Sequence, residues 1–166
     1  MIALKINNKK DFMSKLLVSE LFDDFLVEEA SIDTFVTFSI DGRIHGDFYK
    51  NDADYSEDKI TSDLTFWSEL RQICFDLIKG KRTPLGFKFV FHAGSNVKNN
   101  ILSETASGFT EDQVSLGLTI KFHNGDVVLT TGTAYSFFSL DKTIEKAWDE
   151  FIPSFLEKSG ISCEIL

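Results

Sequence analysis

The segment SIDGRIHGD, residues 39–47, contains the residue types of a serine hydrolase site. Ser39 could act as the nucleophile, His45 as the base and Asp47 as the carboxylate that orients the base. Such a site also needs hydrogen-bond donors for the developing oxyanion, and the GxSxG turn that exposes many nucleophilic serines does not occur in the sequence. We therefore interpret the segment as part of a hairpin and keep catalysis as the alternative.

Two further histidines, His92 and His123, each end a segment in which apolar and polar residues alternate. Histidine is a common acid–base group and metal ligand. If the two expected strands are neighbours in the sheet, the two rings could share one site. The alternative is that both histidines are polar strand ends without a common function.

An acidic segment, NDADYSED, offers oxygen ligands at alternating positions. The residues at the spacing of a calcium-binding loop are Asp52, Asp54, Ser56, Asp58 and Asp63. The sixth position holds glutamate where the sharp turn requires glycine, and the twelfth holds aspartate instead of the bidentate glutamate. We therefore expect a solvated acidic loop, and the sequence predicts neither a bound metal nor a cofactor.

The clearest predicted hairpin is the segment 113–135. Alternating residues flank Asn124-Gly125, the favoured pair for a two-residue turn, and this turn fixes the register. One face of this hairpin then carries only small side chains. The pairs on this face are Gly117 with Gly132, Thr119 with Thr130, and Ser115 with Ala134. Interior strand glycines often mark the close approach of another backbone or a ligand. We expect a helix of this chain, a second subunit or a small ligand to pack there.

These residues must be positioned by an α+β fold with a mainly antiparallel sheet. Periodicity predicts three amphipathic helices in the order β-α-β-β-β-α-β-β-β-α-β. The predicted helix starts are Asn7 or Asn8, Ser62 or Asp63, and Asp141. The first helix should reach Phe25, the third should kink or split at Pro153, and 50–63 and 93–112 should be loops. The expected buried stripe of the second helix is Phe66, Leu70, Ile73, Cys74 and Leu77.

For the segment that contains Ser39, the apolar pattern favours a three-residue hairpin loop at 41–43. The resulting register pairs Ile40 with Ile44, Val36 with Phe48, Ser39 with His45, and Thr37 with Asp47. A strand–helix–strand unit at 2–49 recurs loosely at 47–92, which resembles the halves of a clamp-like fold. The residues of the two units do not repeat.

Composition limits the classes of partner. The 166 residues suit a single domain, 1–166, and the net charge of −9 argues against a nucleic-acid partner. We interpret the cations of KGKRT, 79–83, as complementing the end of the preceding helix. No run approaches the roughly 18 apolar residues of a membrane span. Without a signal peptide, and with two cysteines that lack metal-ligand spacing, the chain is expected to be soluble and cytoplasmic.

The segments MIALKINNKKDFMSKLL and FDDFLVEEASIDTFVTFSIDG carry a resemblance to a family. Over its whole length the chain resembles uncharacterised hypothetical proteins from anaerobic Gram-positive, clostridial-type bacteria. The most specific part is the pattern FxVEEAxIxTFxTFxIDG. The resemblance implies a stand-alone cytoplasmic bacterial protein, and it implies no catalytic residues because the family has no assigned function.

The sequence therefore predicts a cytoplasmic binding protein without catalytic activity, which assembles with itself or with a protein partner. The alternative is a small-ligand-binding protein or a hydrolase-type enzyme that uses the strand-end histidines. A clamp-like protein is the third interpretation.

Overall fold

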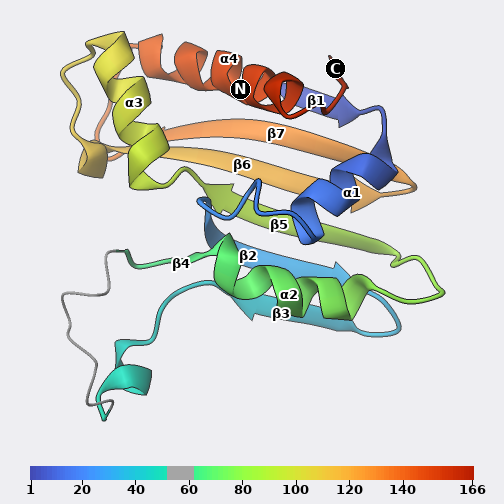
Figure 1. Cartoon of the computed structure of the whole chain (residues 1–166). Helices are drawn as coiled ribbons and strands as arrows, with labels where there is room; N and C mark the ends of the chain where they lie inside the picture. Colours follow the sequence, from blue (N-terminus) through green and yellow to red (C-terminus); the bar gives the residue numbers. More distant parts are fainter. Residues whose placement is uncertain (52–61) are drawn as a thin grey trace.

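The strands of the structure, a computed structural model that describes residues 1–51 and 62–166, form one antiparallel sheet (Figure 1). Their order is β3-β2-β5-β6-β7-β1-β8, and the short β4 pairs with β2. The strands are β1 (Ala3–Ile6), β2 (Leu26–Asp33), β3 (Thr37–Asp41), β4 (Thr65–Phe66), β5 (Gly86–His92), β6 (Val114–His123), β7 (Asp126–Tyr135) and β8 (Cys163–Ile165). The α-helices are α1 (Lys9–Leu17), α2 (Trp67–Ile78), α3 (Ser95–Thr105) and α4 (Thr143–Lys158). The predicted α+β class with an antiparallel sheet is confirmed.

The sheet has two different faces. Helices α1, α2 and α4 lie over one face, and α3 stands at one end beside α4 (Figure 1). On the covered face, alternate strand residues such as Phe87, Phe89 and Phe91 are buried in one apolar cluster. The other face, which we call the open face, carries the remaining strand residues, and most of these are small or polar. This alternation follows from the two-residue period of a strand.

Two tryptophans attach the helices to the rest of the core. Trp148 of α4 is fully buried, and its Nε1–H donates to the carbonyl of Gly117 in β6 at 2.8 Å. Trp67 of α2 donates to the carbonyl of Leu16 in α1 at 2.9 Å. The Trp67 ring also packs 5.0 Å from the ring of Phe89. Each buried indole thus has its polar atom satisfied, as expected for tryptophan in a core.

The β6–β7 hairpin has the predicted register. Asn124 and Gly125 form its turn with positive φ angles of 50° and 80°. The predicted pairs are all present: Gly117 with Gly132, Thr119 with Thr130, and Ser115 with Ala134. The alternating segment that ends at His92 forms β5, with its three phenylalanines on the covered face.

The predicted hairpin at 41–43 is wrong, because the chain turns earlier. Strand β2 pairs with β3 through a turn at 34–36, so Ser39 lies opposite Ser31. Asp41 ends β3 by accepting a hydrogen bond from the backbone N–H of Arg43 at 3.0 Å. Gly42 then passes so close to β2 that a Cβ atom on it would lie 1.8 Å from the carbonyl oxygen of Val27. The glycine therefore serves a close backbone approach and not a hairpin turn.

The predicted helix count is also wrong, because α3 forms within the segment expected to be a loop. Its sequence SNVKNNILSET is polar, and Ile101 is the one residue of the helix that is fully buried. Helix α1 ends at Leu17, and Phe25 packs in the core from the irregular chain beyond it. Helix α4 continues as one element through Pro153.

The buried face of α2 differs from the predicted stripe. The helix starts at Trp67, which is fully buried together with Cys74. Phe66 and Ile73 are 38% and 50% exposed. The expected start at 62–63 is wrong because Thr65 and Phe66 pair with β2 as β4.

The clamp-like interpretation does not fit the topology of the described residues. In the first unit β1 and β2 lie far apart in the sheet, separated by β5, β6 and β7. In the second unit β4 and β5 both pair with β2. The two units therefore do not share an arrangement. Within the described ranges, each helix is too short or too polar to cross a lipid bilayer.

Candidate functional site

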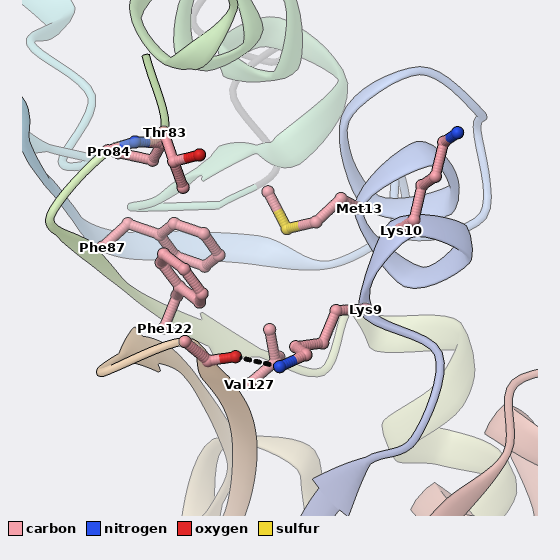
Figure 2. A pocket seen from close by; sticks show the side chains of 9 residues that line it. Lys9, Lys10, Met13, Thr83, Pro84, Phe87, Phe122 and Val127 are labelled. Carbon is pink, nitrogen blue, oxygen red and sulfur yellow. Dashed lines mark hydrogen bonds between the residues drawn. The ribbon is translucent and has the colours of Figure 1, made fainter.

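The helical cover of the sheet has a gap that forms a pocket of about 370 Å³, which we call the end pocket (Figure 2). Its floor is one register row across three strands, because Phe87 of β5 pairs with Phe122 of β6 and Phe122 pairs with Val127 of β7. The Phe87 and Phe122 rings stack with centroids 5.4 Å apart. Phe122 is only partly buried, which leaves apolar surface facing the pocket.

The walls of the end pocket come from α1 and from the loop before β5. Met13 extends from α1 toward the stacked rings, and Thr83 and Pro84 line the opposite side (Figure 2). The Nζ of Lys9 donates to the carbonyl of Gly125 across the pocket. The end pocket therefore combines residues from three separate parts of the chain, 9–13, 83–87 and 122–127.

Lysine side chains lie at the edge of the end pocket. Lys9 lies 3.6 Å from the carboxylate of Asp126, and Lys5 lies 3.1 Å from it. The hydrogen bond from Lys5, followed by the charges of both lysines, lowers the pKa of Asp126. Lys10, also a lining residue, forms no ion pair with the described residues.

The loop that supplies Thr83 and Pro84 carries two more cations directly before them. Lys81 and Arg82 are exposed, and they have no ion-pair partner within residues 1–51 and 62–166. An apolar floor with unpaired cations beside it suits a ligand that has an apolar body and an anionic group. KGKRT directly follows α2, which ends at Ile78, so the predicted role of its cations beside the helix end stays a prediction.

The glycine pair lies on the open face, where no helix of the described chain covers it. A Cβ atom on Gly132 would meet no other atom within 4 Å. A Cβ atom on Gly117 would make only ordinary contacts, the nearest being the carbonyl oxygen of Gly132 at 3.7 Å. The expectation that a helix of this chain packs there is therefore wrong. Gly117 and Gly132 form an uncovered floor, which we call the glycine floor.

His92 borders the glycine floor, because it pairs with Gly117 across β5 and β6. Its Nδ1 lies 2.8 Å from the Oγ of Ser115, and its Nε2 lies 2.5 Å from a carboxylate oxygen of Glu28. The side chains of His92 and Glu28 are 23% and 41% exposed. We call Ser115, His92 and Glu28 the His92 array. It holds a hydroxyl, an imidazole and a carboxylate in hydrogen-bonded sequence on a solvent-accessible face.

The structure does not bring the two strand-end histidines together. His123 pairs with Gly86 at the opposite end of β5 and β6. Six residues of strand separate the two ends, which is about 20 Å. A site shared by His92 and His123 is therefore excluded by the antiparallel pairing.

The residues of the 39–47 segment are also separated. Ser39 lies on β3 and lines a depression of about 220 Å³ together with Glu28, Asp41 and Arg43. His45 and Asp47 lie at the start of a short 3-10 helix, Gly46–Tyr49, where the Asp47 carboxylate is 2.7 Å from Lys50. The backbone N–H of Arg43 is the main cause of the lowered pKa of Asp41.

Four of the five proposed calcium ligands, Asp52, Asp54, Ser56 and Asp58, lie outside the described residues. Asp63 is described, and its carbonyl accepts a hydrogen bond from the backbone N–H of Ile44. Among the described residues there is no group of three or more His, Cys, Asp or Glu side chains that could hold a metal ion.

Sequence reasoning did not find Glu28 or the residues of the end pocket. Glu28 sits at a bulge, because the register shifts between Val27 and Glu29, and a bulge cannot be read from an alternating pattern. Ser115 was placed on the correct face by the hairpin register. Nothing in the spacing of Phe87 and Phe122 indicates that no helix covers this part of the sheet.

The chain belongs to a family of unknown function, DUF5721, whose model matches residues 15–164. The comparisons with curated proteins and with solved structures found no match.

Proposed function

We propose that this protein binds a small molecule with an apolar body and an anionic group in the end pocket. The observation that carries the proposal is the apolar pocket floor of Phe87, Phe122 and Val127, of which Phe122 is partly exposed, with Lys10, Lys81 and Arg82 nearby. The volume of about 370 Å³ falls at the lower end of small-molecule sites, which favours a compact aromatic acid or a short acyl chain over a dinucleotide. The predicted small-ligand alternative is thus the one that this pocket supports.

Binding of 2-naphthoate and octanoate, measured by calorimetry on the full chain, tests the proposal. Two variants attack the two halves of the site: Met13→Trp fills the apolar volume, and Lys10→Glu reverses the charge at its edge. Lys121→Glu on the exposed end of β6 is the matched control for a change in net charge. We expect the first two to weaken binding at least about tenfold, or about 1.4 kcal/mol, and the control to leave it unchanged. Equal loss in Lys10→Glu and Lys121→Glu would show that only net charge matters, and saturable binding unaffected by Met13→Trp would place the ligand elsewhere.

A second candidate function is association with a protein partner or with a second copy of the chain. The loop between β7 and α4 favours it, because Phe138 and Leu140 are 86% and 82% exposed next to the partly exposed Phe137. Exposed apolar patches of this kind often mark interaction surfaces. Native mass spectrometry separates the two candidates, since a dimer that dissociates in Phe138→Ser supports association, whereas a monomer that carries a small ligand supports the end pocket.

We also propose the setting in which the protein works. One sheet and one apolar cluster in the described residues support a single domain, 1–166. Two free cysteines, Cys74 and Cys163, support a reducing, cytoplasmic location. The net charge of −9 supports a partner other than nucleic acid. An origin in anaerobic Gram-positive bacteria stays a prediction that rests on the resemblance in sequence.

A further inference from the structure

We infer that Ser115 is a nucleophile that His92 activates as a general base, and that its substrate is a carboxylic ester whose acyl group lies over the glycine floor. This activity is independent of ligand binding in the end pocket, because the two sites lie on opposite faces of the sheet. The hydrogen-bond order of the His92 array and the free space beside it both support this activity.

The hydrogen-bond partners assign the tautomer of His92. An ionised carboxylate can only accept hydrogen bonds, so the Nε2 that lies 2.5 Å from Glu28 carries the ring proton. The lone pair of a neutral ring is then on Nδ1, which lies 2.8 Å from the Oγ of Ser115. The hydroxyl of Ser115 therefore donates to Nδ1. This is the order required of a nucleophile, its base and the group that orients the base.

The surroundings of Ser115 leave room for a substrate. His92, Gly117 and Gly132 lie side by side on three strands, and Ser115 faces Ala134 in the neighbouring row of the same open face. Since a Cβ atom on Gly132 would meet nothing within 4 Å, the backbone there is open to a flat group. An ester that lies on the glycine floor can reach the partly buried Oγ of Ser115 without displacing a side chain.

The proton transfers of the proposed reaction use the groups of the His92 array and water. The Oγ of Ser115 forms a bond to the carbonyl carbon, and its proton passes to Nδ1 of His92. The bond from that carbon to the leaving oxygen breaks, and His92 gives the proton to the leaving alcohol. Water then attacks the acyl-serine by the same route, so the sum is ester plus water to acid plus alcohol. His92 and Ser115 are the catalytic residues, and Glu28 is a positioning residue.

Labelling with a fluorophosphonate probe, followed by peptide mapping of the full chain, tests the inference. We expect one adduct, at Ser115, with no label in that peptide of Ser115→Ala. His92→Gln should slow the labelling at least about 100-fold, the lower range for loss of a general base. Ser31→Ala is the matched control, because Ser31 lies on the same face and pairs with Ser39 and Lys88. It should label like the wild type.

Glu28 needs a measurement that a purely structural role would not change. Glu28→Ala should lower kcat for 4-nitrophenyl acetate and leave KM unchanged, and Glu28→Gln should retain more activity because its amide oxygen still accepts from Nε2–H. Circular dichroism melting checks that each variant is folded. If Ser115→Ala does not fold, Ser115→Cys replaces it, and its alkylation rate must then depend on His92.

The inference is overturned if Ser115 labels no faster than Ser31, or if His92→Gln labels at the wild-type rate. It is supported if labelling at Ser115 depends on His92. Saturating 2-naphthoate should not change the labelling of Ser115, so the two proposals can fail separately.

Discussion

The two faces of the sheet are built from the same strands, yet they carry different kinds of candidate site. On the covered face the end pocket exists because α1 and the loop before β5 leave a gap above the row of Phe87, Phe122 and Val127. On the open face the His92 array exists because strand register brings a histidine next to a serine and a bulged glutamate. A pocket of the first kind depends on how helices pack, whereas a site of the second kind depends on the pairing of strands alone.

The largest difference between the faces should be in stability. Phe89 is fully buried beneath the helices, and its neighbour Val90 on β5 is only partly buried on the open face. We expect Phe89→Ala to lower the free energy of unfolding by about 3–5 kcal/mol, because it leaves a cavity in a packed core. Val90→Ala should cost roughly 1 kcal/mol or less. Urea unfolding measures both, and equal losses would mean that something covers the open face in solution.

Substitution of two glycines compares a tightly packed part of the backbone with the open face. A Cβ atom on Gly42 would lie 1.8 Å from the carbonyl oxygen of Val27, so Gly42→Ala must push two backbone segments apart. We expect it to destabilise the protein by about 1–3 kcal/mol. Gly132→Ala meets open space and should stabilise by about 0.5–1 kcal/mol, because alanine loses less backbone entropy on folding. A destabilising Gly132→Ala in thermal melts would contradict an uncovered glycine floor.

The reactivity of the two cysteines allows the buried side of α2, which holds Cys74, to be compared with the edge strand β8, which holds Cys163. Burial raises the pKa of Cys74 to about 12, so at pH 8 about one thiol in ten thousand is ionised. Burial, followed by the nearby Glu157, also raises the pKa of Cys163, which is nevertheless partly exposed on β8. We expect maleimide to modify Cys163 first and Cys74 only after unfolding, as read by intact mass. Prior modification of Cys74 would show that α2 opens.

The smallest expected effect is at the edge of the end pocket. Asp126 has a pKa below its ordinary value of 3.8, mainly through its hydrogen bond from Lys5. A carboxylate with a lowered pKa contributes stability above its unfolded pKa and loses this contribution as the pH falls through its folded pKa. Asp126→Asn should therefore lower stability slightly at pH 7 and reduce the further loss of stability on acidification below about pH 4. An unchanged acid limb would show that the ion pairs with Lys5 and Lys9 are fully screened.

Whether an element could be predicted from the sequence depends on the interactions that form it. The β6–β7 hairpin was predicted to the residue pair, because Asn124-Gly125 fixes a local turn and alternating residues agree across it. The turn at 34–36 has no such signal. The apolar residues on both sides of it, together with the Asp41-Gly42 pair, suggested a different turn.

Elements that depend on tertiary contacts were either not predicted from the sequence or predicted with the wrong residues. Helix α3 has one fully buried residue, Ile101, and a polar sequence, so periodicity gives almost no signal for it. Trp67 is the main anchor of α2, but it lies outside the stripe that the helical spacing suggested. Of the His92 array, the hairpin register placed Ser115 on the open face, while the bulge at Glu28 and the contact between β2 and β5 required the structure.

The central claim, that a ligand binds beneath the incomplete helical cover, is tested most directly by titrating the ¹⁵N-labelled protein with 2-naphthoate and following backbone amide shifts. We expect saturable shifts at Met13, Phe122 and Gly125 around the end pocket, and none at Gly117 and Gly132. Shifts confined to the glycine floor, or shifts that never saturate, would contradict it.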